Sequence, residues 1–163
     1  MLVITLRNIG WDNCVPLKYV VFLAGLLVVC SLLLEHVGRL EPCYLCLRER
    51  YVHLIIFLVG IGLLISRVNL TFARLILLSL WVFSTGLAGA HAGFEYGWWQ
   101  LDVPCSGSGL PTSLTQMRSQ LSLELSPRCD EPALVILGIS LAGFNFIISL
   151  FMTLLLSLRP LAR

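Results

Sequence analysis

Two cysteines separated by two residues, Cys43 and Cys46, are the residues of this sequence whose types and spacing most directly suit chemistry. Pro42 precedes them and an apolar segment follows, and proline is favoured in the first turn of a helix. We therefore expect the C-x-x-C motif at a helix N-terminus, where unpaired amides and the helix dipole stabilise a thiolate. The pattern predicts a redox-active thiol pair.

Two further polar residues belong with this motif. Arg50 follows Cys46 by four residues, so on a helix the two share a face, where a guanidinium would favour a thiolate and hold a polar ligand group. His91 lies between Gly89 and Gly93 in an apolar segment. Small residues there suit helix packing, but they equally suit a flat ring, and an ionisable residue within a membrane is a functional hypothesis by default. We expect His91 to donate to a quinone carbonyl.

The other four cysteines divide into two groups. Cys105 and Cys129 flank most of a long polar segment, on the same side of the predicted membrane as the C-x-x-C motif. Cys14 and Cys30 are interpreted as packing residues, because a buried thiol behaves as a small hydrophobe.

The composition defines the elements that must position these residues. Of 163 residues, 58% are hydrophobic and 12% are charged, and the mean hydropathy is +0.91. Soluble domains have about 45–50% apolar and about 25% charged residues. A net charge of +2 also gives no basic surface for nucleic acid. The chain is predicted to be a small integral membrane protein.

The apolar segments predict an all-α integral membrane four-helix bundle, a single domain over residues 1–163. The helices are expected at about 17–37, 44–66, 73–94 and 132–158, because each segment approaches the length of a membrane span without a period of two. Two outward-facing loops cover about 35–50 and 94–132. Within the second loop, the spacing of Leu110, Leu114, Met117 and Leu121 predicts a short amphipathic helix.

Orientation follows from the basic residues. Six of the eleven Lys and Arg residues fall in the shorter segments 1–18, 67–74 and 157–163, and five fall in the two loops. The positive-inside rule then predicts cytoplasmic termini. The cysteine loops would face the periplasm across a bacterial inner membrane, in a compartment that permits disulfides.

Two other chemistries remain open for these residues. A non-catalytic protein would hold zinc with its four outer cysteines, although four-cysteine zinc sites usually use two close pairs. Haem ligated by His36, His53 or His91 is a further alternative. Static disulfides are disfavoured for the C-x-x-C motif, because so short a loop constrains the unfolded chain little.

Several runs of sequence resemble one family. They are Glu41-Pro42-Cys43-Tyr44-Leu45-Cys46, Glu49-Arg50 at the second helix, His91 ahead of the loop pair, and Cys129-Asp130-Glu131-Pro132 before the last helix. Together they are similar to the disulfide bond formation protein B (DsbB) family. In the vitamin K epoxide reductase family, by contrast, the loop pair comes first.

The resemblance implies a quinone-linked thiol oxidase that supports disulfide bond formation, with ubiquinone or menaquinone as cofactor. Cys46 would attack the quinone with Cys43 as its partner, and Arg50 and His91 would lie at the quinone ring. Cys105 would form the mixed disulfide with a soluble thioredoxin-fold oxidase (DsbA-like), and Cys129 would pair with Cys105.

Two positions depart from the family pattern. Glu95 stands four residues after the histidine, where many members have glutamine, and we expect it to contact the quinone. Ala133 and Leu134 follow the last loop cysteine, where many members have tryptophan.

Overall fold

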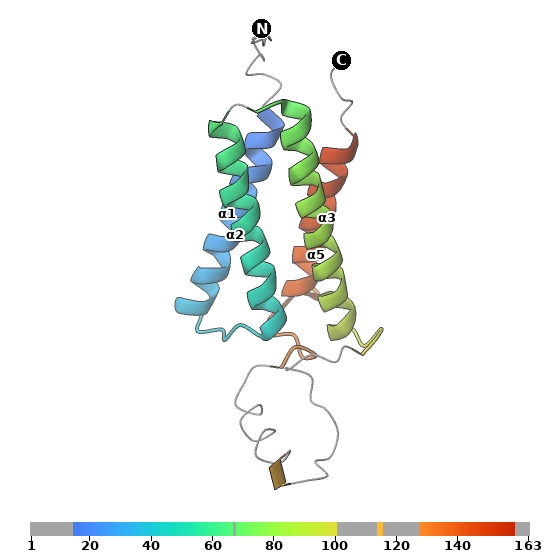
Figure 1. Cartoon of the computed structure of the whole chain (residues 1–163). Helices are drawn as coiled ribbons and strands as arrows, with labels where there is room; N and C mark the ends of the chain where they lie inside the picture. Colours follow the sequence, from blue (N-terminus) through green and yellow to red (C-terminus); the bar gives the residue numbers. More distant parts are fainter. Residues whose placement is uncertain (1–14, 67, 101–113, 116–127, 159–163) are drawn as a thin grey trace, which may run out of the picture.

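The computed structural model describes residues 15–66, 68–100, 114–115 and 128–158. Within these residues it contains four long helices, α1 (Val15–His36), α2 (Tyr44–Ile65), α3 (Leu70–Glu95) and α5 (Leu141–Leu158). A two-stranded antiparallel hairpin, β1 (Val135–Ile136) and β2 (Ile139–Ser140), precedes α5. The helices run side by side, and α1 begins at the end of the bundle where α5 ends (Figure 1).

The bundle is apolar on its outside as well as its inside. Phe22, Phe83 and Phe151 are each more than half exposed, as expected for helices whose outer faces meet lipid. Helices α1, α3 and α5 are long and apolar enough to cross a membrane. In contrast, α2 has three charged residues at positions 48–50. Arg48 is exposed near the start of the helix, whereas Glu49 is buried and Arg50 pairs with Glu35.

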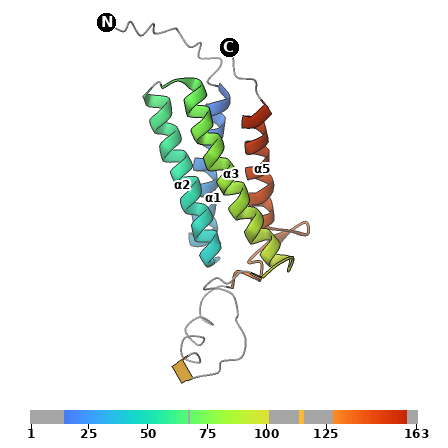
Figure 2. The same ribbon diagram turned by 45° about the vertical axis from the view of Figure 1, so that its right-hand side comes forward.

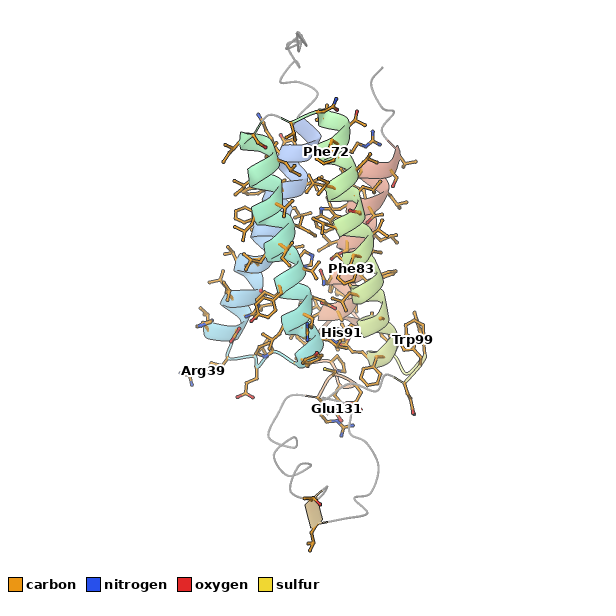
Figure 3. All side chains as sticks on the ribbon, in the orientation of Figure 1. Arg39, Phe72, Phe83, His91, Trp99 and Glu131 are labelled. Carbon is orange, nitrogen blue, oxygen red and sulfur yellow. The ribbon has the colours of Figure 1, made fainter. Side chains whose placement is uncertain are left out.

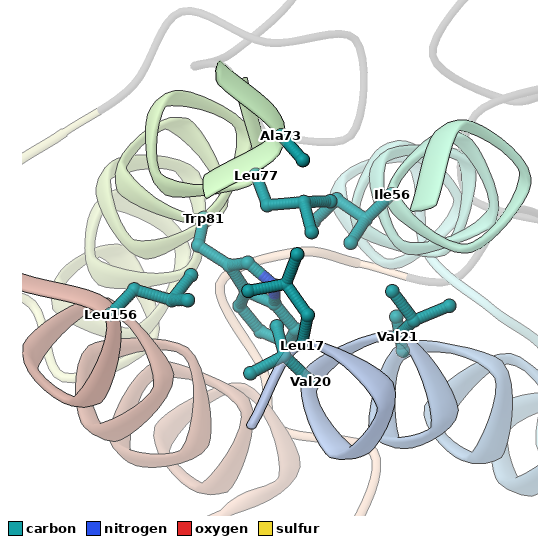
Figure 4. Packing of buried hydrophobic residues seen from close by; sticks show 9 residues of the cluster. Leu17, Val20, Val21, Ile56, Ala73, Leu77, Trp81 and Leu156 are labelled. Atoms are coloured by element: carbon teal, nitrogen blue, oxygen red, sulfur yellow. The ribbon is translucent and has the colours of Figure 1, made fainter. Parts of the chain in front are cut away.

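An apolar core fills the half of the bundle near the start of α1. Trp81, Leu77 and Ile56 are fully buried there, in one cluster with residues of α1 and α5 (Figure 4). The Arg74 side chain links α3 to the end of α5, since its Nε donates to the Leu156 carbonyl at 2.6 Å. This half holds the four helices together.

A smaller cluster occupies the opposite end of the bundle. It joins Cys43, Leu45, Phe94 and Cys129, with Cys46 packed against it. Figure 3 shows His91 inside the bundle toward this end, with Phe72 at the other end. Most of the residues that the sequence analysis singled out therefore gather at one end of the molecule.

The last helix differs from the prediction. It begins at Leu141 rather than near residue 132, because residues 135–140 form the hairpin beside the start of α5 (Figure 2). Leu137 and Gly138 have positive φ values of 53° and 82°, which is the backbone of a tight two-residue turn. The β-branched residues on either side suit strands.

The other helix bounds lie close to the prediction. Helices α1 and α2 agree within two residues, and α3 begins three residues early because Asn69 caps it, with Asn69 Oδ1 accepting from the Thr71 amide at 2.8 Å. The predicted amphipathic helix of the second loop lies outside the described residues, except that Leu114 and Thr115 are helical.

Candidate functional site

Cys43 is the N-cap of α2, so the C-x-x-C motif lies at a helix N-terminus as the sequence predicts. Cys43 Sγ accepts a hydrogen bond from the Cys46 amide at 3.2 Å, in the role that serine or aspartate usually has at this position. The sulfur atoms of Cys43 and Cys46 lie 2.8 Å apart in a thiol hydrogen bond. Both cysteines are free thiols.

The surroundings of Cys43 favour its thiolate. The hydrogen bond with the Cys46 side chain, followed by the contact with His91, lowers the pKa of Cys43 well below that of an ordinary thiol, although burial opposes this shift. Cys43 is 5% exposed, so few reagents reach the sulfur except through the site. The structure therefore contains a nucleophilic sulfur in a shielded position.

A chain of buried polar groups leads away from this sulfur. His91 Nε2 lies 3.6 Å from Cys43 Sγ, and His91 Nδ1 lies 2.9 Å from Glu49 Oε1. A carboxylate only accepts, so Nδ1 donates to Glu49 while Nε2 faces the sulfur. Glu49 Oε2 in turn accepts from Asn145 Nδ2 at 2.7 Å. Residues of α2, α3 and α5 together thus fix the imidazole in one orientation.

A cavity of about 200 Å³ adjoins this chain of groups. Its lining combines apolar residues of α1 and α5 with the polar site residues Cys43, Cys46, Glu49, Arg50, His91 and Glu95. Arg50 pairs with Glu35 through one terminal nitrogen, but Arg50 Nε is buried and has no hydrogen-bond partner among the described residues. A ligand oxygen in the cavity would satisfy that donor.

The structure brings most of the predicted site residues together. Cys43, Cys46, Arg50, His91 and Glu95 line one cavity, with Glu95 Oε1 3.6 Å from His91 Nε2. The groups that lower the pKa of Cys43 are Cys46 and His91, while the Arg50 guanidinium is paired with Glu35.

The predicted loop cysteine Cys129 joins this end of the molecule. It is fully buried, disulfide-bonded, and packed in the cluster that contains Cys43. Its expected partner, Cys105, lies outside the described residues. A disulfide at Cys129 leaves that sulfur no thiolate to offer, which disfavours a zinc site built from the four outer cysteines.

Two other interpretations change. Cys30 is exposed on α1 and lines the cavity, rather than packing in the core. Cys14 lies outside the described residues. His53 has a partner at each ring nitrogen, the Glu49 carbonyl at 2.9 Å and Ser84 Oγ at 3.4 Å, which leaves neither nitrogen free for haem.

Glu49 and Asn145 are the site residues to which sequence reasoning assigned no role. Glu49 follows Cys46 by three residues, so helical spacing already places the two on one face. Asn145 is the only amide side chain in the mostly apolar helix α5, and intramembrane polar residues commonly face the bundle interior.

Comparison with known proteins agrees with this geometry. A family model described as disulfide bond formation protein DsbB matches residues 16–158. An uncharacterized protein of Rickettsia prowazekii (strain Madrid E) is 27% identical over 127 residues, covering 76% of this chain and 74% of that protein. No solved structure matches the chain significantly. Because the family model covers most of the chain, and the paired thiols lie at one end of an apolar helical bundle, the chain belongs to the DsbB family of disulfide bond formation membrane proteins.

Proposed function

We propose that this protein reoxidises a soluble periplasmic thioredoxin-fold oxidase (DsbA-like). Two electrons would enter at Cys105 and Cys129, pass to Cys43 and Cys46, and leave to a membrane quinone. The observation that best supports this relay is the packing of the Cys129 disulfide in the same buried cluster as the Cys43 thiol. A disulfide beside a dithiol is the arrangement that thiol–disulfide exchange requires.

Each exchange step in this relay balances. The partner's two thiols become a disulfide while the Cys105–Cys129 disulfide becomes two thiols, with Cys105 as the sulfur attacked. A second exchange restores that disulfide and reduces the Cys43–Cys46 pair. The lowered pKa of Cys43 supports this step, because a low-pKa sulfur is a good leaving group when a loop thiolate attacks the Cys43–Cys46 disulfide.

The cavity suits a quinone as the electron-accepting substrate. A bound quinone would take up two electrons and two protons. Arg50 Nε is buried without a partner in the described part of the chain, and it would donate to an oxygen acceptor. Leu27, Leu34 and Ile148 give the cavity apolar walls. In this proposal Cys46 attacks the quinone after its proton passes to the Cys43 sulfur 2.8 Å away, and His91 and Glu95 lie beside the quinone.

Quinone reduction by the purified protein tests the proposal. Reduced thioredoxin-fold partner and ubiquinone or menaquinone are mixed with the protein without oxygen, and quinone absorbance is followed. We expect turnover that is lost in Cys46→Ser and in Cys129→Ser, and that persists in Cys30→Ala. Full turnover in Cys46→Ser would refute the assigned relay.

The arginine has its own test. We expect Arg50→Met to require more quinone for half-maximal turnover, while the loop disulfide still reacts with the partner. An unchanged quinone requirement would show that the Arg50 guanidinium does not hold the substrate.

A further inference from the structure

We propose that the reduced site is also a binding site for a thiophilic divalent cation, with zinc as the reference ion. The ligands are Cys43, Cys46, His91 and Glu95. This inference is independent of the quinone relay, because it concerns the resting dithiol and needs neither quinone nor partner. The ligand set also differs from one built of outer cysteines alone.

The ligand atoms of the two cysteines and the histidine already lie at suitable distances. The Sγ atoms of Cys43 and Cys46 and a ring nitrogen of His91 all lie within 4.8 Å of one another. Zinc–sulfur and zinc–nitrogen bonds of about 2.3 and 2.1 Å at a tetrahedral angle put sulfur and nitrogen about 3.6 Å apart. The observed separation between Cys43 Sγ and His91 Nε2 is 3.6 Å.

The two sulfurs must separate slightly. Two thiolates on one tetrahedral zinc ion lie about 3.8 Å apart, whereas these sulfurs are 2.8 Å apart. Cys46 is in the first turn of α2 and is only partly buried. A small rotation of its side chain toward the cavity supplies the difference.

The histidine is held as metal-ligating histidines usually are. Such a residue donates its second ring N–H to a carboxylate, which fixes the tautomer and the ring plane. Here His91 Nδ1–H donates to Glu49 at 2.9 Å, and Asn145 holds Glu49 from the other side at 2.7 Å. Nε2 therefore faces Cys43 before any ion binds, and zinc would take the place of a proton on this nitrogen.

Glu95 provides the fourth ligand. Its side chain is 6% exposed, and its Oε1 lies 3.6 Å from His91 Nε2. Its Oε2 is buried and has no hydrogen-bond partner among the described residues. Ser140 contacts the same carboxyl group, but the buried Oε2 has no donor of its own among the described residues, and a cation beside the imidazole would satisfy it directly.

The oxidation state of the pair controls this site. Zinc binding displaces the protons still held by the ligand atoms and changes no oxidation number. A Cys43–Cys46 disulfide has no thiolate to offer, so the oxidised protein lacks the site. Bound zinc would in turn occupy both sulfurs and block their oxidation.

Zinc titration of the full-length protein with Cys105→Ser and Cys129→Ser tests the inference, since reduction then exposes only the C-x-x-C pair of the outer cysteines. The protein is reduced, freed of metal, and titrated with Zn²⁺ against a chromophoric chelator. Co²⁺ serves as a second probe, because cobalt bound to thiolates absorbs strongly. We expect one ion per reduced protein and none in the same protein after oxidation.

Variants then identify the ligands. We expect His91→Ala to weaken zinc binding more than 100-fold, and Glu49→Gln to weaken it about 10–100-fold through the histidine. Glu95→Gln is expected to weaken zinc binding and to change the cobalt spectrum. His36→Ala is the matched control and should bind as the parent does.

Two outcomes would overturn the inference. If the Cys105→Ser, Cys129→Ser protein bound zinc equally well when reduced and when oxidised, the ion would lie elsewhere. This comparison requires no substitution beyond those two. Unchanged affinity in His91→Ala, with a melting temperature like that of the parent, would leave the cysteines without the proposed histidine ligand. Neither result bears on quinone reduction, so the relay is judged separately.

Discussion

At the scale of single residues, the site depends on how Cys43 is held. As the N-cap of α2 it accepts from the Cys46 amide, and it contacts the Cys46 thiol and His91. These contacts lower its pKa. Because the lowered value belongs to the folded protein, the thiolate persists as the pH falls through the range in which an unfolded thiol is already protonated.

Alkylation of the reduced protein checks this pKa. With a metal chelator present, we expect iodoacetamide to modify Cys43 at pH 6 with little loss of rate relative to pH 8. The same protein denatured in detergent should lose most of its rate over that interval. A folded protein whose Cys43 reactivity falls about tenfold per pH unit below 8 would contradict the lowered pKa.

Glu49 is a positioning residue for this thiol, acting through His91. Replacing its carboxylate with the amide in Glu49→Gln keeps the shape but removes the negative charge that favours a protonated imidazole. We expect the pH midpoint for Cys43 alkylation to rise by about one unit. Glu131→Gln is the control, since the Glu131 side chain is 70% exposed. An unmoved midpoint in Glu49→Gln would assign Glu49 a purely structural role.

At the scale of elements, glycines allow α1 and α2 to approach closely, and Gly60 makes the tighter of the two contacts. A Cβ built on Gly60 would lie 2.3 Å from a methyl carbon of Val21, whereas a Cβ on Gly62 meets nothing within 4 Å. Both residues are interior to α2, so alanine improves helix propensity equally at both. The difference between the two substitutions isolates helix packing.

Thermal denaturation of the two variants measures that packing. We expect Gly60→Ala to destabilise the bundle by about 1–3 kcal/mol, through overpacking against α1. Gly62→Ala should be neutral or stabilising by up to about 1 kcal/mol. Equal melting temperatures for the two variants would mean that α1 and α2 do not approach as described.

The helices illustrate what a sequence can predict. Long apolar runs locate α1 and α2 within two residues, because membrane spans have a fixed length and no alternative backbone. The hairpin before α5 was missed because residues 133–140 are as apolar as the helix that follows. The positive φ values at Leu137 and Gly138 form the turn there, and a turn of this kind cannot be predicted from hydrophobicity.

The sequence predicts the parts of the site that are formed by residues close together in the chain. The C-x-x-C spacing gives the N-terminal thiol pair, and the i, i+4 spacing gives Arg50. The contacts of Glu49 with His91 and Asn145 span 42 and 96 residues, so they depend on how three helices pack. No local pattern specifies such contacts, and only the polarity of these residues within apolar helices indicates them.

At the scale of the whole molecule, the residues that stabilise the bundle and the reactive residues lie at opposite ends. The apolar core around Trp81 lies toward the end where α1 begins, and the thiols and the cavity lie at the other. Four successive helices bring the chain back to the end of the bundle where it started, so α1 begins where α5 ends (Figure 1). If the positive-inside rule holds, the core end faces the cytoplasm and the thiols face the periplasm.

Reporter fusions test this orientation directly. Alkaline phosphatase is active only after export, so we expect activity when it is fused after Trp99 and none when it is fused after Asn69 or at the C-terminus. Six basic residues lie in segments 1–18, 67–74 and 157–163. They keep these segments in the cytoplasm, because each basic residue resists transfer across the membrane. The reverse pattern would place the thiols in a reducing compartment, where a disulfide at Cys129 would not persist. Orientation is therefore a condition for the relay, and it can be decided before any partner is known.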